Sequence, residues 1–409
     1  GFVYNNGRAR TMLYPDIGGK RGIVNETNVL SHCGFFMIKH LYIDRAVQAH
    51  PETRRIRDRL KRPFTLVDST KAVFNRLLKA DDPQTEGKHT LILTRNQGRY
   101  LRQCPGTRHY RCCGYKILHI GTYCSMDCAY CILQAYFHPP VLQYFVNHEA
   151  MWSELETPFS APRVSRIGTG EFTDSLIWEP WTAPSRRLIE RFATQDHAVL
   201  ELKTKTTAID HLLPIDHNRK TILAWSLNTP RVIASQERAT ATLKARLAAA
   251  ARCQTRGYPV AFHFDPLILY DGCEAEYGQV IEMLAEQTDL TGVVWISLGA
   301  LRFMPSLKAI IQRRFPASKI PYGEFTAGLD GKMRYFRPMR VALYRSMAAA
   351  LLKLNPALTL YFCMESDDVW RQVLGYAPDE QGGIAAMLDR SAMHNCELDA
   401  SLKIGASAC

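Results

Sequence analysis

From residue 116 onward, two patterns of apolar positions alternate along the chain. Short apolar runs, typical of buried strands, are separated by segments whose apolar residues recur every three to four positions, as on one face of a helix. The predicted strands cover residues 116–120, 164–168, 198–203, 221–227, 260–264 and 293–297. The clearest predicted helices cover residues 240–256 and 275–287. Strands that alternate with helices indicate a parallel sheet, and six such units in roughly 180 residues predict an open, partial barrel.

The flanking segments predict two smaller units. Residues 1–113 form an N-terminal α/β region, residues 114–318 the barrel, and residues 319–409 a C-terminal region with a basic hairpin and a helix. We therefore expect an α/β fold built on a partial (β/α)6 barrel, with ligands at the carboxyl ends of its strands. Outside the barrel, strands are predicted over 39–44, 63–67, 90–94 and 358–362, helices over 46–62 and 340–352, and a loop over 81–87.

Three cysteines follow the first barrel strand with the spacing C-x3-C-x2-C, namely Cys124, Cys128 and Cys131. Three thiolates can ligate three irons of a cubane cluster and leave the fourth iron open. An open iron can bind the amino and carboxylate groups of S-adenosylmethionine (SAM). The alternative is zinc, which usually takes four closed ligands from paired C-x2-C motifs.

The aromatic Tyr130 stands directly before the third cysteine, and with it the motif resembles that of the radical SAM superfamily. The resemblance implies a [4Fe–4S] cluster on the three cysteines and a 5′-deoxyadenosyl radical made from SAM. It also implies a partial (β/α)6 barrel, in agreement with the strand pattern. In such enzymes the cofactor performs the difficult step and the protein positions it.

Polar residues recur where the predicted barrel strands end. Gly170-Glu171 resembles the glycine–glutamate turn of the superfamily, in which glycine admits the methionine end of SAM and the carboxylate accepts from its ammonium group. A plain strand-end turn is the alternative. Lys205 is a candidate partner for the SAM carboxylate. The candidate SAM-binding residues are Gly170, Glu171, Thr173, Lys205, Ser226 and Asn228.

Matches spread over residues 39–363 resemble one branch of the superfamily, the spore photoproduct lyases. They include Cys131-Ile-Leu-Gln134, Thr204-Lys205, Ser226-Leu-Asn228 and Arg302-Phe303. The resemblance implies a light-independent lyase that cleaves a methylene-bridged thymine photodimer in DNA.

Two positions depart from that family. Its members place a cysteine after the second strand, which returns a hydrogen atom to the product radical, and a tyrosine beside the third cluster cysteine, which relays it. Glu171 and Ile132 stand in these places, and only Tyr130 is kept. Tyr130 and Glu171 are thus the candidate catalytic residues. Either another group donates the hydrogen, such as Tyr130 or a cysteine brought in by folding, or the substrate and the reaction differ.

The remaining cysteines are unusually numerous. The chain has twelve cysteines, and with no secretory signal we expect a reducing, cytoplasmic location in which they are thiols or metal ligands. Cys104, Cys112 and Cys113 could join Cys363 or Cys396 in a second metal site, give up a hydrogen atom, or be buried and inert. Cys273 is a weaker candidate donor.

The formal net charge of +12 favours a polyanionic partner, and damaged DNA is the expected one. Arginines can hold phosphates while aromatic rings stack on bases. The alternative is a solvated basic hairpin. An electron donor such as flavodoxin or ferredoxin is also expected. No membrane partner is expected, because no apolar run is long enough for a membrane helix. The candidate DNA-binding residues are Arg302, Arg334, Tyr335 and Arg337.

Two other functions remain open at this level. The same radical chemistry could act on RNA, a peptide or a small metabolite. An iron–sulfur protein could also bind nucleic acid without turnover, although Gly170-Glu171 and Lys205 argue against this because a binding protein needs no SAM pocket.

Overall fold

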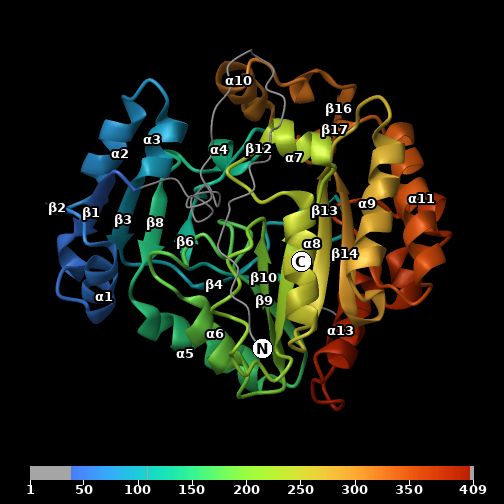
Figure 1. Ribbon diagram of the computed structural model, residues 1–409, viewed down its shortest axis with the longest axis horizontal. Helices are drawn as coiled ribbons and strands as arrows, with labels where there is room; N and C mark the ends of the chain where they lie inside the picture. Colours follow the sequence, from blue (N-terminus) through green and yellow to red (C-terminus); the bar gives the residue numbers. More distant parts are fainter. Residues whose placement is uncertain (1–37, 108, 406–409) are drawn as a thin grey trace, which may run out of the picture.

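The computed structural model describes residues 38–107 and 109–405, so the first 37 residues of the predicted N-terminal region lie outside it. A curled eight-stranded sheet with the order β18-β14-β13-β11-β10-β9-β5-β4 runs through the molecule (Figure 1). Neighbouring strands are parallel except β4 and β5, which are antiparallel. The predicted partial barrel and its six strands are confirmed, and β18 extends the sheet. The strands are β4 (Leu101–Gln103), β5 (Lys116–Leu118), β9 (Ser165–Gly168), β10 (Ala198–Thr204), β11 (Thr221–Ser226), β13 (Val260–Leu267), β14 (Val293–Ala300) and β18 (Leu360–Phe362).

A second sheet with the order β2-β1-β3-β8-β6 lies beside the barrel. Its last two strands come after residue 113, whereas β4, which comes before it, belongs to the barrel sheet. The two sheets are therefore interleaved along the chain and are not divided at the predicted boundary. The strands are β1 (His40–Asp44), β2 (Thr65–Val67), β3 (Thr90–Thr94), β6 (Gly121–Thr122) and β8 (Leu142–Phe145).

One predicted loop is a helix. Residues 81–87 were expected to be irregular, but α3 (Pro83–His89) begins there. The Asp82 carboxylate accepts from the backbone N–H of Thr85, and Pro83 occupies the first helical position, where no N–H is needed. A helix cap therefore outweighs the polar, glycine-containing sequence that predicted a loop.

Helices surround both sheets, and the predicted helices over 240–256, 275–287 and 340–352 are present as α8, α9 and α11. No helix in the described ranges is long and apolar enough to cross a membrane. The other helices are α1 (Pro51–Leu60), α2 (Thr70–Leu78), α4 (Leu133–Tyr136), α5 (His148–Ser160), α6 (Ser185–Phe192), α7 (Pro230–Gln236), α10 (Pro305–Arg314), α12 (Asp367–Leu374) and α13 (Gly383–Asn395), with α8 at Leu243–Gln254, α9 at Cys273–Gln287 and α11 at Arg337–Leu354.

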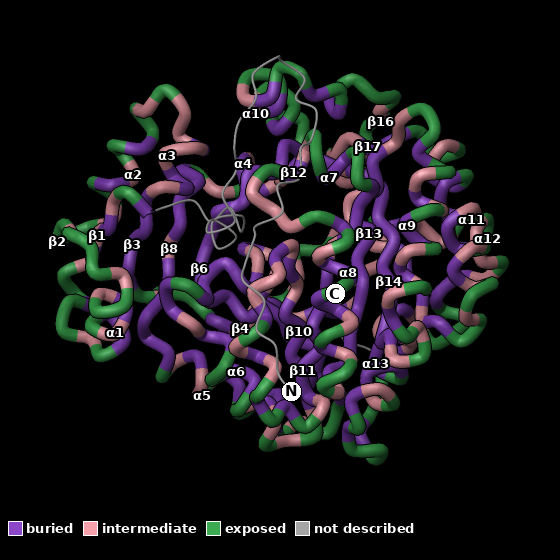
Figure 2. Tube along the Cα trace, in the orientation of Figure 1, coloured by how far each residue is buried: buried purple, intermediate pink, exposed green. Residues whose placement is uncertain are grey.

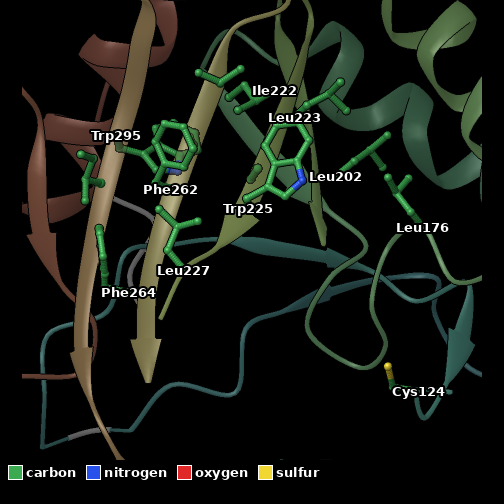
Figure 3. Close-up of a cluster of buried hydrophobic side chains, with 14 of the residues drawn as sticks. Cys124, Leu176, Leu202, Ile222, Leu223, Trp225, Leu227, Phe262, Phe264 and Trp295 are labelled. Atoms are coloured by element: carbon green, nitrogen blue, oxygen red, sulfur yellow. The ribbon is translucent and has the colours of Figure 1, made fainter. Parts of the chain in front are cut away.

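The main core lies in and around the barrel sheet, whose central strands are buried along nearly their whole length (Figure 2). All eight residues of β14 are buried. Parallel strands covered on both faces read as continuous apolar runs, which is why the pattern predicted them. Trp225, Phe262 and Trp295 are large members of this cluster, to which Cys124 also belongs (Figure 3).

Candidate active site

The three motif cysteines lie in the loop between β6 and α4. Cys128 is part of β7 (Asp127–Cys128), a two-residue strand that pairs with β12 (Glu237–Arg238). Cys124 and Cys128 are buried, and Cys131 is partly exposed. Burial raises the pKa of Cys124 and of Cys128, and the charge of Cys131 adds to both shifts. Cys131 is therefore close enough to interact electrostatically with both other thiols.

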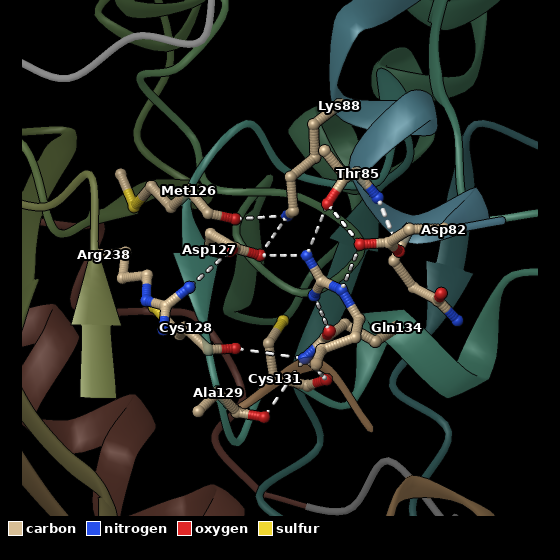
Figure 4. A network of polar contacts seen from close by, with 12 residues as sticks. Asp82, Thr85, Lys88, Met126, Asp127, Cys128, Ala129, Cys131, Gln134 and Arg238 are labelled. Atoms are coloured by element: carbon tan, nitrogen blue, oxygen red, sulfur yellow. Dashed lines mark hydrogen bonds and ion pairs between the residues drawn. The ribbon is translucent and has the colours of Figure 1, made fainter. Parts of the chain in front are cut away.

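Side chains from outside the loop hold its backbone carbonyls (Figure 4). The buried ammonium group of Lys88 donates to the carbonyl of Cys124 at 3.0 Å and also to that of Met126. The Gln134 amide donates to the carbonyls of Cys128 and Ala129, both at 3.1 Å. These bonds tie the backbone carbonyls of the loop to α3 and α4 and so fix its shape.

The donor set suits an iron–sulfur cluster with one open iron: three thiols on a fixed loop, with a lysine ammonium group 4.0 Å from the sulfur of Cys128. A nearby cation favours the thiolate form that a metal requires. In the described part of the chain, no three or more His, Cys, Asp or Glu side chains already stand at metal-binding distances.

That lysine, Lys205, belongs to a buried network around Tyr130. Its ammonium nitrogen lies 2.6 Å from the Tyr130 hydroxyl and 3.0 Å from the carboxylate of Glu237. The Tyr130 hydroxyl donates to the same carboxylate, and Arg246 donates to its other oxygen at 2.5 Å. Burial alone would raise the pKa of Glu237, but Arg246 and Lys205 lower it to about 2. The carboxylate is therefore ionised and anchors both cations.

Sequence reasoning missed Glu237 and Arg246. Glu237 is 107 residues from Tyr130, and only the pairing of β7 with β12 brings them together. No local motif marks either residue. Lys205 was predicted, but as a partner for SAM rather than as a member of an internal network.

The turn that contains Gly170 and Glu171 packs tightly against β10. A Cβ atom on Gly170 would lie 2.8 Å from the Cβ of Lys203, so only glycine fits. The Glu171 carboxylate forms an ion pair with Lys203 and is about one third exposed. Its charge is thus already partly balanced by the protein.

Asp174 fastens the same turn to the end of β10. Its carboxylate accepts from the backbone N–H of Lys205 and from the Thr204 hydroxyl, both at 2.9 Å. Thr173 is buried beside it and donates to the Asp174 carbonyl at 3.2 Å. The turn predicted from sequence is therefore rigid and lies at the carboxyl ends of β9 and β10.

The two candidates after β11 differ in their surroundings. Asn228 is buried, its amide donates to the Pro266 carbonyl at 2.9 Å, and its oxygen accepts from the Tyr277 hydroxyl at 2.8 Å. Ser226 is only partly buried at the end of the strand. Asn228 thus already serves the fold, and Ser226 is the better placed of the two for a ligand.

The four DNA-binding candidates differ in how far their side chains are exposed to solvent. Arg334 is buried and binds Asp330 at 2.8 Å, and Tyr335 is 1% exposed. Arg302 binds Asp265 at 3.1 Å in a partly buried pair. Contact of Arg334 or Tyr335 with DNA would require these arrangements to break. Arg337, by contrast, has 55% of its side chain exposed.

A curled, mostly parallel half-barrel with three thiols just beyond its first parallel strand has the architecture of a radical SAM protein. A sequence profile described as spore photoproduct lyase matches residues 107–337. The chain belongs to the spore photoproduct lyase family.

Two curated relatives give the extent of the similarity. The chain is 30% identical to the spore photoproduct lyase of Bacillus subtilis (strain 168) over 209 residues, which are 50% of this chain and 61% of the relative. It is 27% identical to the lyase of Clostridium acetobutylicum over 257 residues, 62% of this chain and 72% of the relative. The chain thus matches less than two thirds of the length of the Bacillus protein.

Solved structures of spore photoproduct lyase share the fold. A variant with dinucleoside spore photoproduct has a TM-score of 0.71 at 22% identity, and a second variant, with bound AdoMet and the same dinucleoside, has a TM-score of 0.70 at 22% identity. Each comparison covers 80% of this chain and 99% of the other. The predicted fold class is confirmed.

Proposed function

We propose that the chain is a radical SAM lyase that cleaves a methylene-bridged thymine photodimer in DNA without light. One observation carries the proposal: a rigid three-thiol loop lies beside a buried lysine–tyrosine–glutamate network at the barrel mouth, in a chain of the spore photoproduct lyase family. When bound, a [4Fe–4S] cluster and SAM would supply a 5′-deoxyadenosyl radical.

Cys124, Cys128 and Cys131 would hold the cluster as thiolates. Their loop is buried, so water is largely excluded from two of the three sulfurs. The positive charge of Lys205 near Cys128 offsets part of the negative charge that three thiolates bring into a buried site.

SAM would lie between this loop and the ends of β9, β10 and β11. Gly170 lets its turn pack closely against β10, and Glu171 and Thr173 belong to the same turn. Ser226 offers a hydroxyl group at the end of β11. The side-chain bonds of Asn228 suggest that it shapes the pocket indirectly. The Lys203 partner of Glu171 would have to share that carboxylate with the ammonium group of SAM.

DNA would bind at the face that displays Arg337, with the chain's net charge of +12 increasing its affinity for a polyanion. A photodimer must leave the helical stack to reach a barrel mouth, and a damaged base leaves it at lower cost than a sound one. A reductant of the flavodoxin or ferredoxin class would supply the electron.

The proposal is tested with reconstituted, chemically reduced protein, SAM and UV-damaged or undamaged oligonucleotides. We expect 5′-deoxyadenosine to form, damaged DNA to stimulate its formation, and Cys128→Ala to abolish it. A complete lack of SAM cleavage would refute the enzymatic proposal. Cleavage that damaged DNA does not stimulate would refute the proposed substrate.

A further inference from the structure

A cysteine-containing segment closes the open side of the half-barrel. Residues 104–107 and 109–114 lie between β4 and β5 at one edge of the barrel sheet, whereas β18 forms the other edge. The backbone N–H of Arg111 donates to the carbonyl of Glu365 at 3.2 Å, and its guanidinium binds Asp367 at 2.7 and 2.6 Å. Both acidic residues come just after β18, so Arg111 joins the two edges of the sheet.

Both edges of the sheet contribute thiols to this seam, the line along which the closing segment meets the chain after β18. Cys104 and Cys113 come from the closing segment, and Cys363 comes directly after β18. Burial raises the pKa of Cys104, and the charges of Glu171, Cys113 and Cys363 raise it further. Cys104 is therefore within electrostatic reach of the other two thiols and of Glu171, which belongs to the turn proposed to bind SAM.

Cys363 is the seam thiol that is best fixed in place. Its sulfur accepts from the Arg302 guanidinium at 3.1 Å, and Arg302 is itself held by Asp265. Asp265 and Arg302 lie on β13 and β15 (Arg302–Phe303), so the sulfur is tied to the barrel wall. Arg302, predicted to bind DNA, thus contacts a thiol.

Three other thiols of the described chain lie away from the closing segment. Cys253 and Cys396 are fully buried, and Cys273 is buried on α9. The lysine beside Cys396, Lys220, donates to its carbonyl at 3.0 Å. Of the two distant partners that the sequence suggested for the closing segment, the structure brings only Cys363 to it.

The protonation state of Cys363 is consistent with a role as a hydrogen-atom donor. Burial raises the pKa of Cys363 to about 12, so the sulfur keeps its proton at neutral pH. A donor of hydrogen atoms needs this intact S–H bond.

We propose that Cys363 donates the hydrogen atom that quenches the product radical, an inference that rests on the lyase function proposed above. The S–H bond breaks homolytically, a C–H bond forms at the carbon radical left when the cross-link breaks, and the sulfur keeps one unpaired electron. One electron from a donor of the flavodoxin or ferredoxin class and one proton from solvent restore the thiol. Cys363 thereby supplies what Glu171, which has no S–H bond, cannot.

The test follows solvent deuterium into the repaired DNA. Thiol hydrogens exchange with solvent, so wild-type protein in D2O should yield repaired thymine that carries deuterium. Cys363→Ser keeps an acceptor for Arg302, but its O–H bond is too strong to donate a hydrogen atom. It should still cleave SAM and consume the lesion, while deuterated product is lost and incompletely quenched products accumulate. Cys104→Ser and Cys253→Ser should retain the deuterated product.

Failure of the inference and failure of the proposed function are distinguishable. If wild-type protein consumes no lesion, the lyase function is refuted. If it repairs the lesion and Cys363→Ser yields the same deuterated product, or if Cys104→Ser alone loses it, the role of Cys363 is refuted.

Discussion

The ammonium nitrogen of Lys205 lies 2.6 Å from the hydroxyl oxygen of Tyr130. Both groups contact the carboxylate of Glu237, which faces Cys128 across the paired strands β7 and β12. Tyr130, the end of β10 and the short strand β12 are thus joined through one buried carboxylate. The network positions the loop of Cys124, Cys128 and Cys131, the proposed cluster loop, against the barrel.

Glu237→Gln should strongly destabilise the protein. The change leaves Arg246, which is fully buried, and Lys205 without their counter-charge. Breaking a buried ion pair in this way costs about 3–5 kcal/mol. The free energy of unfolding, measured with urea, checks this. Glu190→Gln removes a partner of the exposed Arg186 and should change it by less than about 1 kcal/mol. Equal effects would contradict the anchoring role of Glu237.

Lys88→Met should weaken the cluster loop. It removes the donor to the carbonyls of Cys124 and Met126, and each buried acceptor left unpaired costs about 1–3 kcal/mol. We expect a lower iron content per chain after reconstitution, measured together with visible absorbance. Lys71→Met, at an exposed position on α2, is the matched control. Iron content equal to that of the wild type would show that Lys88 does not shape the loop.

Gly170→Ala should impair SAM binding. The added Cβ would meet the Cβ of Lys203 at 2.8 Å, and overpacking of this kind costs about 1–3 kcal/mol. Gly278→Ala, on α9, has no atom within 4 Å of its new Cβ and should stabilise the helix by about 0.5–1 kcal/mol. Equilibrium SAM binding should fall only for Gly170→Ala. Unchanged affinity would remove this turn from the proposed SAM site.

The His119→Phe variant should lose less stability than the wild type as the pH decreases. His119 packs edge-on against Phe145 and Phe172, and neither ring nitrogen has a hydrogen-bond partner among the described residues. Burial lowers the pKa of His119 to about 3. Between pH 6.5 and 3 the unfolded chain binds a proton that the folded chain excludes, so stability falls as the pH decreases through this window.

His119→Phe removes this titrating group. The free energy of unfolding of the variant should therefore rise relative to that of the wild type as the pH decreases. Between pH 7 and pH 5 the gain should be about 2 kcal/mol, since one pKa unit corresponds to about 1.4 kcal/mol. Urea unfolding at the two pH values measures it. Parallel pH profiles for the two proteins would contradict the prediction.

Arg334→Ala should lower stability, whereas Arg337→Ala should weaken DNA binding. Loss of Arg334 removes the nearer ion-pair partner of the buried Asp330 carboxylate. The change should lower the free energy of unfolding by about 3–5 kcal/mol. Loss of the exposed Arg337 should leave stability within about 0.5 kcal/mol but weaken DNA binding and lower its salt dependence by about one ion. Unfolding and salt-dependent binding isotherms separate the two. DNA affinity unchanged by Arg337→Ala would exclude this face.

The barrel could be predicted because its strands are buried on both faces, so their apolar runs are continuous, as in β14. The cysteine spacing is a local motif and was equally visible. The helix α3 was not predicted, since its sequence is polar and its start depends on the Asp82 cap. Local pattern thus identifies elements whose stability comes from burial better than it identifies those that depend on one hydrogen bond.

The supporting residues of the site could not be predicted from local pattern. Lys88 and Glu237 act on the cluster loop from 36 and 107 residues away, and nothing in their immediate sequence marks them as buried. The predicted basic hairpin, with Arg334 and Tyr335, suggested an exposed surface, but Arg334 is buried in an ion pair with Asp330, four residues before it. Burial of charge depends on partners that only the fold supplies.

In the most direct measurement, reduced, reconstituted protein is incubated with SAM and an oligonucleotide that contains one methylene-bridged thymine dimer. The products are identified by mass. We expect the lesion to be consumed and two adjacent thymines to be restored, with no reaction for Cys128→Ala. SAM cleavage that leaves the lesion intact would contradict the proposed function.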